Sequence, residues 1–80
     1  MEETKSYQAG DTKRVLIEQM LKEVIDALEE RGYQPINQLV GYLMSGDPGY
    51  ISSHKEARTK IQKYDRAEIL EFLLSQYQEN

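Results

Sequence analysis

The chain has no cysteine and no tryptophan, and it has one histidine and two prolines among its 80 residues. Without cysteine, neither a disulfide bond nor a thiolate metal site can form. One histidine cannot build a histidine-rich metal site, and the order of the serine, histidine and aspartate residues suggests no catalytic triad. We therefore expect a protein without enzymatic activity, catalytic residues, bound metal or cofactor.

The chain also lacks a long apolar run and an excess of positive charge. No apolar stretch approaches the roughly 18 residues of a membrane span, and the polar residues 1–5 are unlike a signal peptide. The formal net charge is −4, whereas a general nucleic-acid binder normally carries net positive charge. We expect a cytoplasmic protein with no membrane insertion and no nucleic-acid partner.

The residue pattern predicts an all-α fold, a compact bundle of about four helices with a flexible N-terminal tail. Residues 1–11 have little apolar content and are interpreted as the tail, and residues 12–80 as a single helical domain. Apolar spacing and helix-start patterns place the helices at 12–31, 35–45, 53–63 and from 66 onward. No segment alternates polar and apolar residues with a period of two, so we expect no sheet.

Several helix ends have recognisable signals. Asp11 or Thr12 is a candidate N-cap of the first helix, and Gly32 stands where a C-terminal glycine would end it. Residues 53–56 and 65–68 both follow the capping-box pattern, in which an N-cap side chain and a glutamate three residues later satisfy free backbone N–H groups. We expect both boxes to form.

Apolar residues of the second and fourth helices recur at the spacing of one helix face. The expected buried positions are Ile36, Leu39, Val40, Leu43 and Met44 in the second helix, and Ile69, Leu70, Leu73, Leu74 and Tyr77 in the fourth. Phe72 is expected at the edge of the fourth stripe. Gly41 lies within the second helix, either as a tolerated residue or where another helix approaches closely. A domain this short buries a small core, so we expect a homodimer.

A basic segment spans residues 53–66. It holds five basic and two acidic side chains in a chain that is acidic overall. Within a continuous helix, Arg58 and Arg66 would share a face. This face is either simply solvated or a docking patch for an acidic or phosphorylated partner, because arginine pairs well with carboxylates and phosphates. His54 is expected to be an exposed residue in the first turn of the third helix.

Two blocks in the middle of the chain resemble the IreB family of small regulatory phosphoproteins from Gram-positive bacteria. One block is Gly-Tyr-Gln-Pro-Ile-Asn-Gln at residues 32–38, and the other is Ser-Gly-Asp-Pro-Gly-Tyr at residues 45–50. His-Lys-Glu-Ala-Arg at residues 54–58 continues the likeness, which covers about residues 24–77.

The resemblance implies a helical homodimer that is phosphorylated by a membrane Ser/Thr protein kinase. Family members act in cell-envelope homeostasis and intrinsic cephalosporin resistance. The unphosphorylated form is similar to an adaptor that promotes Clp-dependent degradation of the enzyme committing UDP-N-acetylglucosamine to peptidoglycan synthesis, and phosphorylation relieves that action. The implied partners are thus the kinase, the Clp protease machinery or its client enzyme, and a second copy of the chain.

The resemblance also implies site residues. The phospho-acceptor of the family is a tail threonine followed three residues later by an aromatic residue, a pattern that Thr4 and Tyr7 match. Arg58 and Arg66 match arginines of relatives, and they are the implied partner-binding residues, whereas Ser53 and Gln62 stand where relatives often carry arginine.

Three other hypotheses remain open at this point. The 53–66 segment could form a nucleic-acid-binding module, whose affinity would fall steeply with salt. An enzyme or small-ligand site could lie around His54 and Asp47, which would require a pocket with convergent polar groups. A purely structural dimer would be indifferent to changes in the tail.

Overall fold

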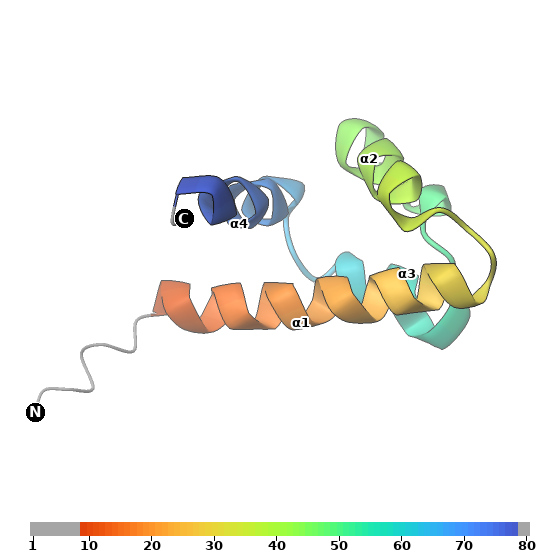
Figure 1. Cartoon of the computed structure of the whole chain (residues 1–80), viewed down its shortest axis with the longest axis horizontal. Coiled ribbons are helices and arrows are strands. Elements are labelled where there is room, and N and C mark those ends of the chain that lie inside the picture. The colour runs from red at the N-terminus through yellow and green to blue at the C-terminus, as the bar shows by residue number, and fades with distance from the viewer. Residues whose placement is uncertain (1–8, 79–80) are drawn as a thin grey trace, which may run out of the picture.

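A single long helix forms the base on which the other elements pack (Figure 1). The computed structural model describes residues 9–78, and this part of the chain contains helices and no strand. The elements are α1 (Ala9–Glu30), α2 (Pro35–Ser45), the 3-10 turns η2 (Pro48–Tyr50) and η3 (His54–Glu56), α3 (Ala57–Ile61) and α4 (Arg66–Gln78). The predicted all-α architecture of four helices is confirmed.

Helix α1 begins earlier than the sequence predicts. It starts at Ala9, so Asp11 and Thr12 lie inside the helix and the prediction of an N-cap at either position is wrong. Alanine is the strongest helix former, and no proline follows it to stop the helix. Residues 9–11 of the predicted tail are therefore helical, and the rest of that segment lies outside the described residues.

The end of α1 and the start of α2 follow the local signals. Gly32 has a φ of +82°, its N–H donates to the carbonyl of Glu29 at 3.0 Å, and the N–H of Tyr33 donates to the carbonyl of Leu28 at 3.0 Å. These two bonds are the pair that ends a helix in a Schellman motif. Pro35 occupies the first turn of α2, where a missing N–H costs nothing.

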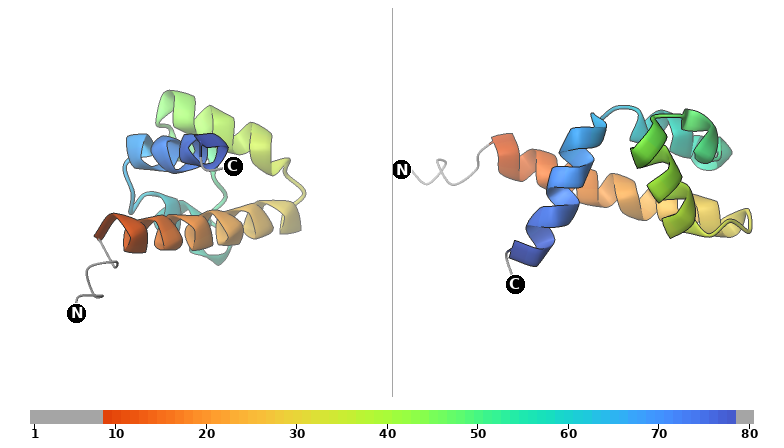
Figure 2. Two further views of the ribbon diagram at one scale, coloured as in Figure 1. Left: turned by 60° about the vertical axis from the view of Figure 1, so that its left-hand side comes forward. Right: turned by 90° about the horizontal axis from the view of Figure 1, so that it is seen from above.

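Helices α2 and α4 cross the same side of α1, next to each other (Figure 2). Leu39 and Tyr42 are the buried residues of α2, and Ile69 and Phe72 are those of α4. The core consists of Ile17, Met20, Leu21, Val24, Ala27, Leu28, Leu39, Tyr42, Ile51, Ala57, Ile61, Ile69 and Phe72. Six of these residues, from Ile17 to Leu28, lie on one face of α1.

The apolar faces predicted for α2 and α4 are largely wrong. Ile36 and Met44 are 66% and 80% exposed, and Leu74 and Tyr77 are 67% and 85% exposed. Phe72, expected at an edge, is buried instead. The physical reason is that each helix has apolar residues around more than half its circumference, and the crossing over α1 selects the side that is buried. The remaining apolar side faces outward.

Gly41 is required by a close approach, although the neighbour is an aromatic ring and not a helix. A Cβ atom at Gly41 would lie 2.8 Å from Cζ of Tyr50. Tyr50 ends the turn η2, in which its N–H donates to the carbonyl of Asp47 at 3.2 Å. The next residue, Ile51, is completely buried, so this loop folds back onto the core.

Of the two predicted capping boxes, the one at residues 53–56 does not form. The Ser53 side chain caps nothing, and the hydroxyl of Ser52 instead accepts the N–H of His54 at 3.0 Å. Lys55 and Glu56 adopt left-handed φ values of 53° and 61°, so a helix cannot run through this segment. The second box does form in part, because the N–H of Asp65 donates to Oε1 of Glu68 at 3.1 Å.

Candidate functional site

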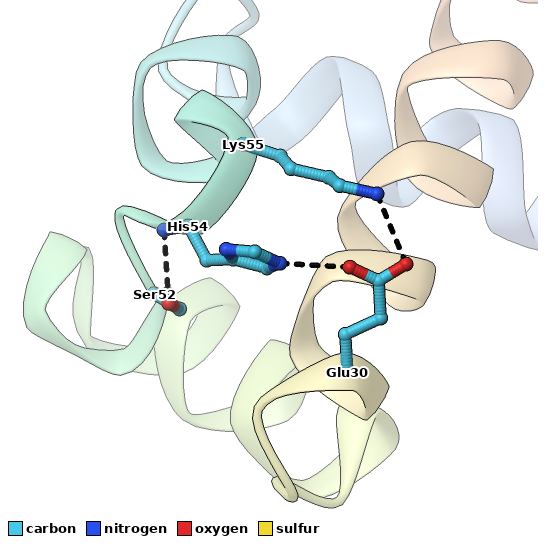
Figure 3. Close-up of polar contacts among 4 residues, drawn as sticks. All are labelled: Glu30, Ser52, His54 and Lys55. Atoms are coloured by element: carbon cyan, nitrogen blue, oxygen red, sulfur yellow. Dashed lines mark hydrogen bonds and ion pairs between the residues drawn. The ribbon is translucent and has the colours of Figure 1, made fainter.

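The end of α1 is held to the turn η3 by one carboxylate, that of Glu30 (Figure 3). Its Oε1 lies 2.7 Å from Nε2 of His54, and its Oε2 accepts a hydrogen bond from Nζ of Lys55 at 3.0 Å. The His54 side chain is therefore hydrogen-bonded and 28% exposed, and not the freely exposed residue that the sequence suggested. Through these contacts His54 and Lys55 connect η3 to the end of α1.

The cluster is both electrostatically favourable and conformationally strained. The hydrogen bond from His54, followed by that from Lys55, lowers the pKa of Glu30 below its ordinary value. Two consecutive non-glycine residues with positive φ, Lys55 and Glu56, each cost of order 1–3 kcal/mol. The hydrogen bonds from His54 and Lys55 to Glu30 help to hold the strained turn η3. The conformation of η3 sets the direction of α3, which follows it.

Arg58, one of the two predicted partner-binding residues, is tied to the loop before it. Its Nε donates to the carbonyl of Ile51 at 2.9 Å, and its backbone N–H donates to the carbonyl of Ser52 at 3.1 Å. The side chain is partly buried. Arg58 thus joins α3 to the buried Ile51 segment, and its removal would disturb the fold as well as any surface that it presents.

Arg66, the other predicted partner-binding residue, lies at the start of α4 and caps the end of α2. Its Nη1 donates to the carbonyl of Leu43 at 3.1 Å, one of the carbonyls left without a partner at a helix C-terminus. The same guanidinium covers Gly46, where a Cβ atom would lie 2.9 Å from Cζ of Arg66. Because α3 ends at Ile61, Arg58 and Arg66 belong to different helices and do not form the continuous helical face considered above.

The basic segment 53–66 is largely satisfied within the chain. Lys55 pairs with Glu30, and Nζ of Lys60 lies 3.1 Å from Oε1 of Glu23. Acidic residues of α1 thus neutralise part of the local positive charge, and a free basic stripe does not form. This pairing disfavours a nucleic-acid interface, since phosphate binding depends on available cationic side chains.

Seven large apolar side chains of α2 and α4 are exposed to solvent. They are Ile36, Val40 and Met44 of α2 and Leu70, Leu73, Leu74 and Tyr77 of α4. Helix α2 has no charged residue along its entire length. An exposed apolar area rimmed by polar residues is typical of a protein interaction site. We call these seven residues the α2/α4 apolar surface.

The remaining sequence-based expectations are tested only where the structure describes the chain. Thr4 lies outside the described residues. Among residues 9–78, no three acidic or histidine side chains gather in a way that could hold a metal ion. None of the helices in this range combines the length and apolar character needed to cross a membrane.

The family of this protein follows from a match over nearly the whole chain. A family model described as IreB regulatory phosphoprotein matches residues 2–79. The chain belongs to the IreB family. The IreB match confirms the resemblance based on residues 32–38 and 45–50, and it supports a regulatory role for a phosphoprotein. The residues matched by the IreB model also include Thr4, Arg58 and Arg66.

The structure adds two positioning residues that the sequence did not single out. The contacts of Glu30 with His54 and Lys55 join positions about two dozen residues apart in the sequence. Glu68 was expected only as a capping residue, yet it also pairs with Lys13 of α1. The sequence shows that the chain carries residues of opposite charge, but it does not show which of them lie close together in the fold.

Proposed function

We propose that this protein is a non-enzymatic regulatory protein whose binding to a partner is switched by phosphorylation of Thr4. The observation that carries the proposal is the IreB match over residues 2–79. Thr4 falls within that match and has Tyr7 three residues later, as the family's acceptor pattern requires. The modifying enzyme in this proposal is a membrane Ser/Thr protein kinase, and the protein acts in the cytoplasm.

The downstream role in this proposal is control of peptidoglycan synthesis. The unphosphorylated protein acts as an adaptor for Clp-dependent degradation of a peptidoglycan-precursor enzyme, and phosphorylation relieves this action. Such control would influence cell-envelope homeostasis and cephalosporin resistance. An adaptor needs binding surfaces and no catalytic centre, and the α2/α4 apolar surface offers one such area.

The α2/α4 apolar surface also supports a homodimer. Two copies that covered each other's apolar residues would supply the burial that a chain of this size lacks. Arg58 and Arg66 remain the proposed polar contacts to the partner. Each guanidinium already donates one hydrogen bond to a backbone carbonyl of its own chain. Only the outward part of each guanidinium can then serve the partner.

The direct test is phosphorylation by the cognate kinase domain, followed by site mapping with mass spectrometry. We expect one phosphate on Thr4 in the native chain, none in Thr4→Ala, and an unchanged result in the matched control Ser6→Ala. Pull-downs from a lysate with the two forms should then recover the client enzyme mainly with the unphosphorylated protein. Stoichiometric phosphorylation of Thr4→Ala would overturn the assignment of the site.

A further inference from the structure

Residues 53–56 have the sequence of a helix start and the backbone of a strained turn. Ser-His-Lys-Glu is a capping-box pattern, in which Ser53 would cap a helix beginning at His54 and Glu56 would bond back to the serine. In the structure, Lys55 and Glu56 have φ values of 53° and 61°, and the Ser53 side chain makes no capping hydrogen bond. The segment therefore carries the signals of a conformation that it does not adopt.

Contacts with α1 hold the turn in the conformation observed. Oε1 of Glu30 lies 2.7 Å from Nε2 of His54, and Oε2 of Glu30 accepts a hydrogen bond from Nζ of Lys55 at 3.0 Å (Figure 3). Two consecutive left-handed residues that carry a Cβ atom persist only where such contacts over-determine them. The Lys55 and Glu30 side chains are 60% and 45% exposed, so a binding partner can reach the contact that holds the turn.

A helix that began at His54 would use the same residues differently. The hydroxyl of Ser53 would accept the N–H of Glu56, and the N–H of Arg58 would donate to the carbonyl of His54, four residues earlier. In the structure, the N–H of Arg58 donates instead to the carbonyl of Ser52 at 3.1 Å. The helical state needs no left-handed residue, but it gives up the turn that directs His54 toward Glu30.

We propose that residues 53–56 form a two-state element, which exchanges between the left-handed turn bound to Glu30 and a capped helical turn that extends α3 at its N-terminus. Glu30 sets the balance, because its contacts favour the left-handed turn, whereas backbone preference and the capping box favour the helix. A partner group that binds Glu30 or Lys55 in one state only shifts this equilibrium.

The exchange changes how Arg58 is held. In the left-handed state, Nε of Arg58 donates to the carbonyl of Ile51 at 2.9 Å, and the backbone N–H of Arg58 is bonded to Ser52. The helical state takes that N–H away from Ser52 and so alters the position of the guanidinium relative to Ile51. The consequence for a partner rests on the proposed role of Arg58 in binding, whereas the two-state element does not depend on the proposed function.

The experiment follows the backbone of Lys55 and Glu56 by NMR in the full-length chain labelled with ¹⁵N and ¹³C. A positive φ brings the amide hydrogen of a residue close to its own Hα, which gives a strong intraresidue NOE. We expect strong NOEs at both residues in the native chain, and in Glu30→Ala a loss of intensity to the level of Thr59 inside α3. Glu29→Ala is the matched control, because Glu29 is an exposed glutamate at the neighbouring position, and it should keep the native intensities.

Two further substitutions in the Glu30→Ala background identify the second state. Ser53→Ala removes the cap of the helical turn, and the Ser53 side chain caps nothing in the left-handed turn, so this change should restore the strong NOEs. Glu56→Gly removes both the capping glutamate and the cost of a left-handed residue with a Cβ atom, so it should restore the strong NOE at Lys55. A second state that Ser53→Ala does not reverse would show that it is not the capped helix.

Thermal unfolding of two glycine variants tests the strained turn without any change at Glu30. Glu56→Gly should raise the unfolding midpoint, whereas the matched control Thr59→Gly, at an exposed position inside α3, should lower it. Equal losses in the two variants would overturn the strained turn, and strong NOEs that persist in Glu30→Ala would overturn the control by Glu30. These measurements involve no kinase and no partner, so their failure is distinct from a failure of the proposed function.

Discussion

The ring of Tyr50 lies over Gly41 so closely that there is no room for a methyl group between them. A Cβ atom at Gly41 would lie 2.8 Å from Cζ of the ring. The carbonyl of Tyr50 also accepts a hydrogen bond from Nε2 of Gln38 at 2.9 Å, so the turn η2 is fixed to α2 by two adjacent contacts. The glycine in the middle of α2 is thereby explained by packing.

Gly41→Ala should destabilise the protein, although alanine favours a helix by about 1 kcal/mol over glycine. The added methyl group forces the Tyr50 ring aside, and overpacking of this kind costs roughly 1–3 kcal/mol. Chemical denaturation should therefore show a net loss in the free energy of unfolding of about 1 kcal/mol. In a Tyr50→Ala background the same change should become stabilising, and a loss of equal size there would contradict the packing explanation.

Glu30→Gln should reduce the dependence of stability on acidic pH. The contacts with His54 and Lys55 lower the pKa of Glu30, so the folded state favours the charged carboxylate. The resulting stabilisation is fully present above the unfolded carboxyl pKa of about 4.3, and it is lost as the pH falls below that value through the folded pKa.

Thermal unfolding midpoints measured between neutral pH and pH 3 test this expectation. The native chain should lose stability more steeply below pH 4.5 than Glu30→Gln does. Glu29→Gln is the matched control, because its carboxylate makes no ion pair with the described residues and carries the same charge. Parallel acid curves for the native chain and Glu30→Gln would show that the Glu30 contacts do not persist in solution.

Arg58→Gln should weaken the fold as well as any partner contact. The hydrogen bond from Nε to the carbonyl of Ile51 is partly buried, and loss of a hydrogen bond of this type costs about 0.5–1.5 kcal/mol. Lys63→Gln, which removes an exposed charge of the same segment, should leave the free energy of unfolding unchanged. Equal effects of the two substitutions would argue against a structural role for Arg58.

The combined substitution Met44→Glu and Leu74→Glu should abolish the proposed homodimer. The two side chains are highly exposed within one chain, so glutamate is tolerated in the monomer, whereas burying the charges in an interface is strongly unfavourable. Sedimentation velocity should show a dimer for the native chain and for the control Lys63→Glu, and a monomer for the double variant. Far-UV circular dichroism should show that the helices remain, and a dimer that persists would exclude this surface as the interface.

Much of the local structure is determined by the sequence itself. The spacing of Ile17, Val24 and Leu28 marks the buried face of α1, and Gly32 and Pro35 mark the change from one helix to the next. These features depend on backbone geometry within a few residues, so they can be inferred without tertiary contacts. The exceptions are the start of α1, which lies at Ala9 and not at the predicted N-cap Asp11 or Thr12, and the segment 53–56, where a capping pattern was present but two left-handed residues prevented its use.

Only the tertiary structure decided which apolar side of α2 and α4 is buried and where the charged residues find their partners. Helical periodicity permits more than one buried face, and the crossing over α1 selects Tyr42 and Phe72 while leaving Met44 and Leu74 exposed. The Lys13–Glu68 pair joins residues 55 positions apart. Such contacts depend on how the helices are arranged in space. Neither helix propensity nor the charge pattern of the sequence shows which charged residues will lie close together.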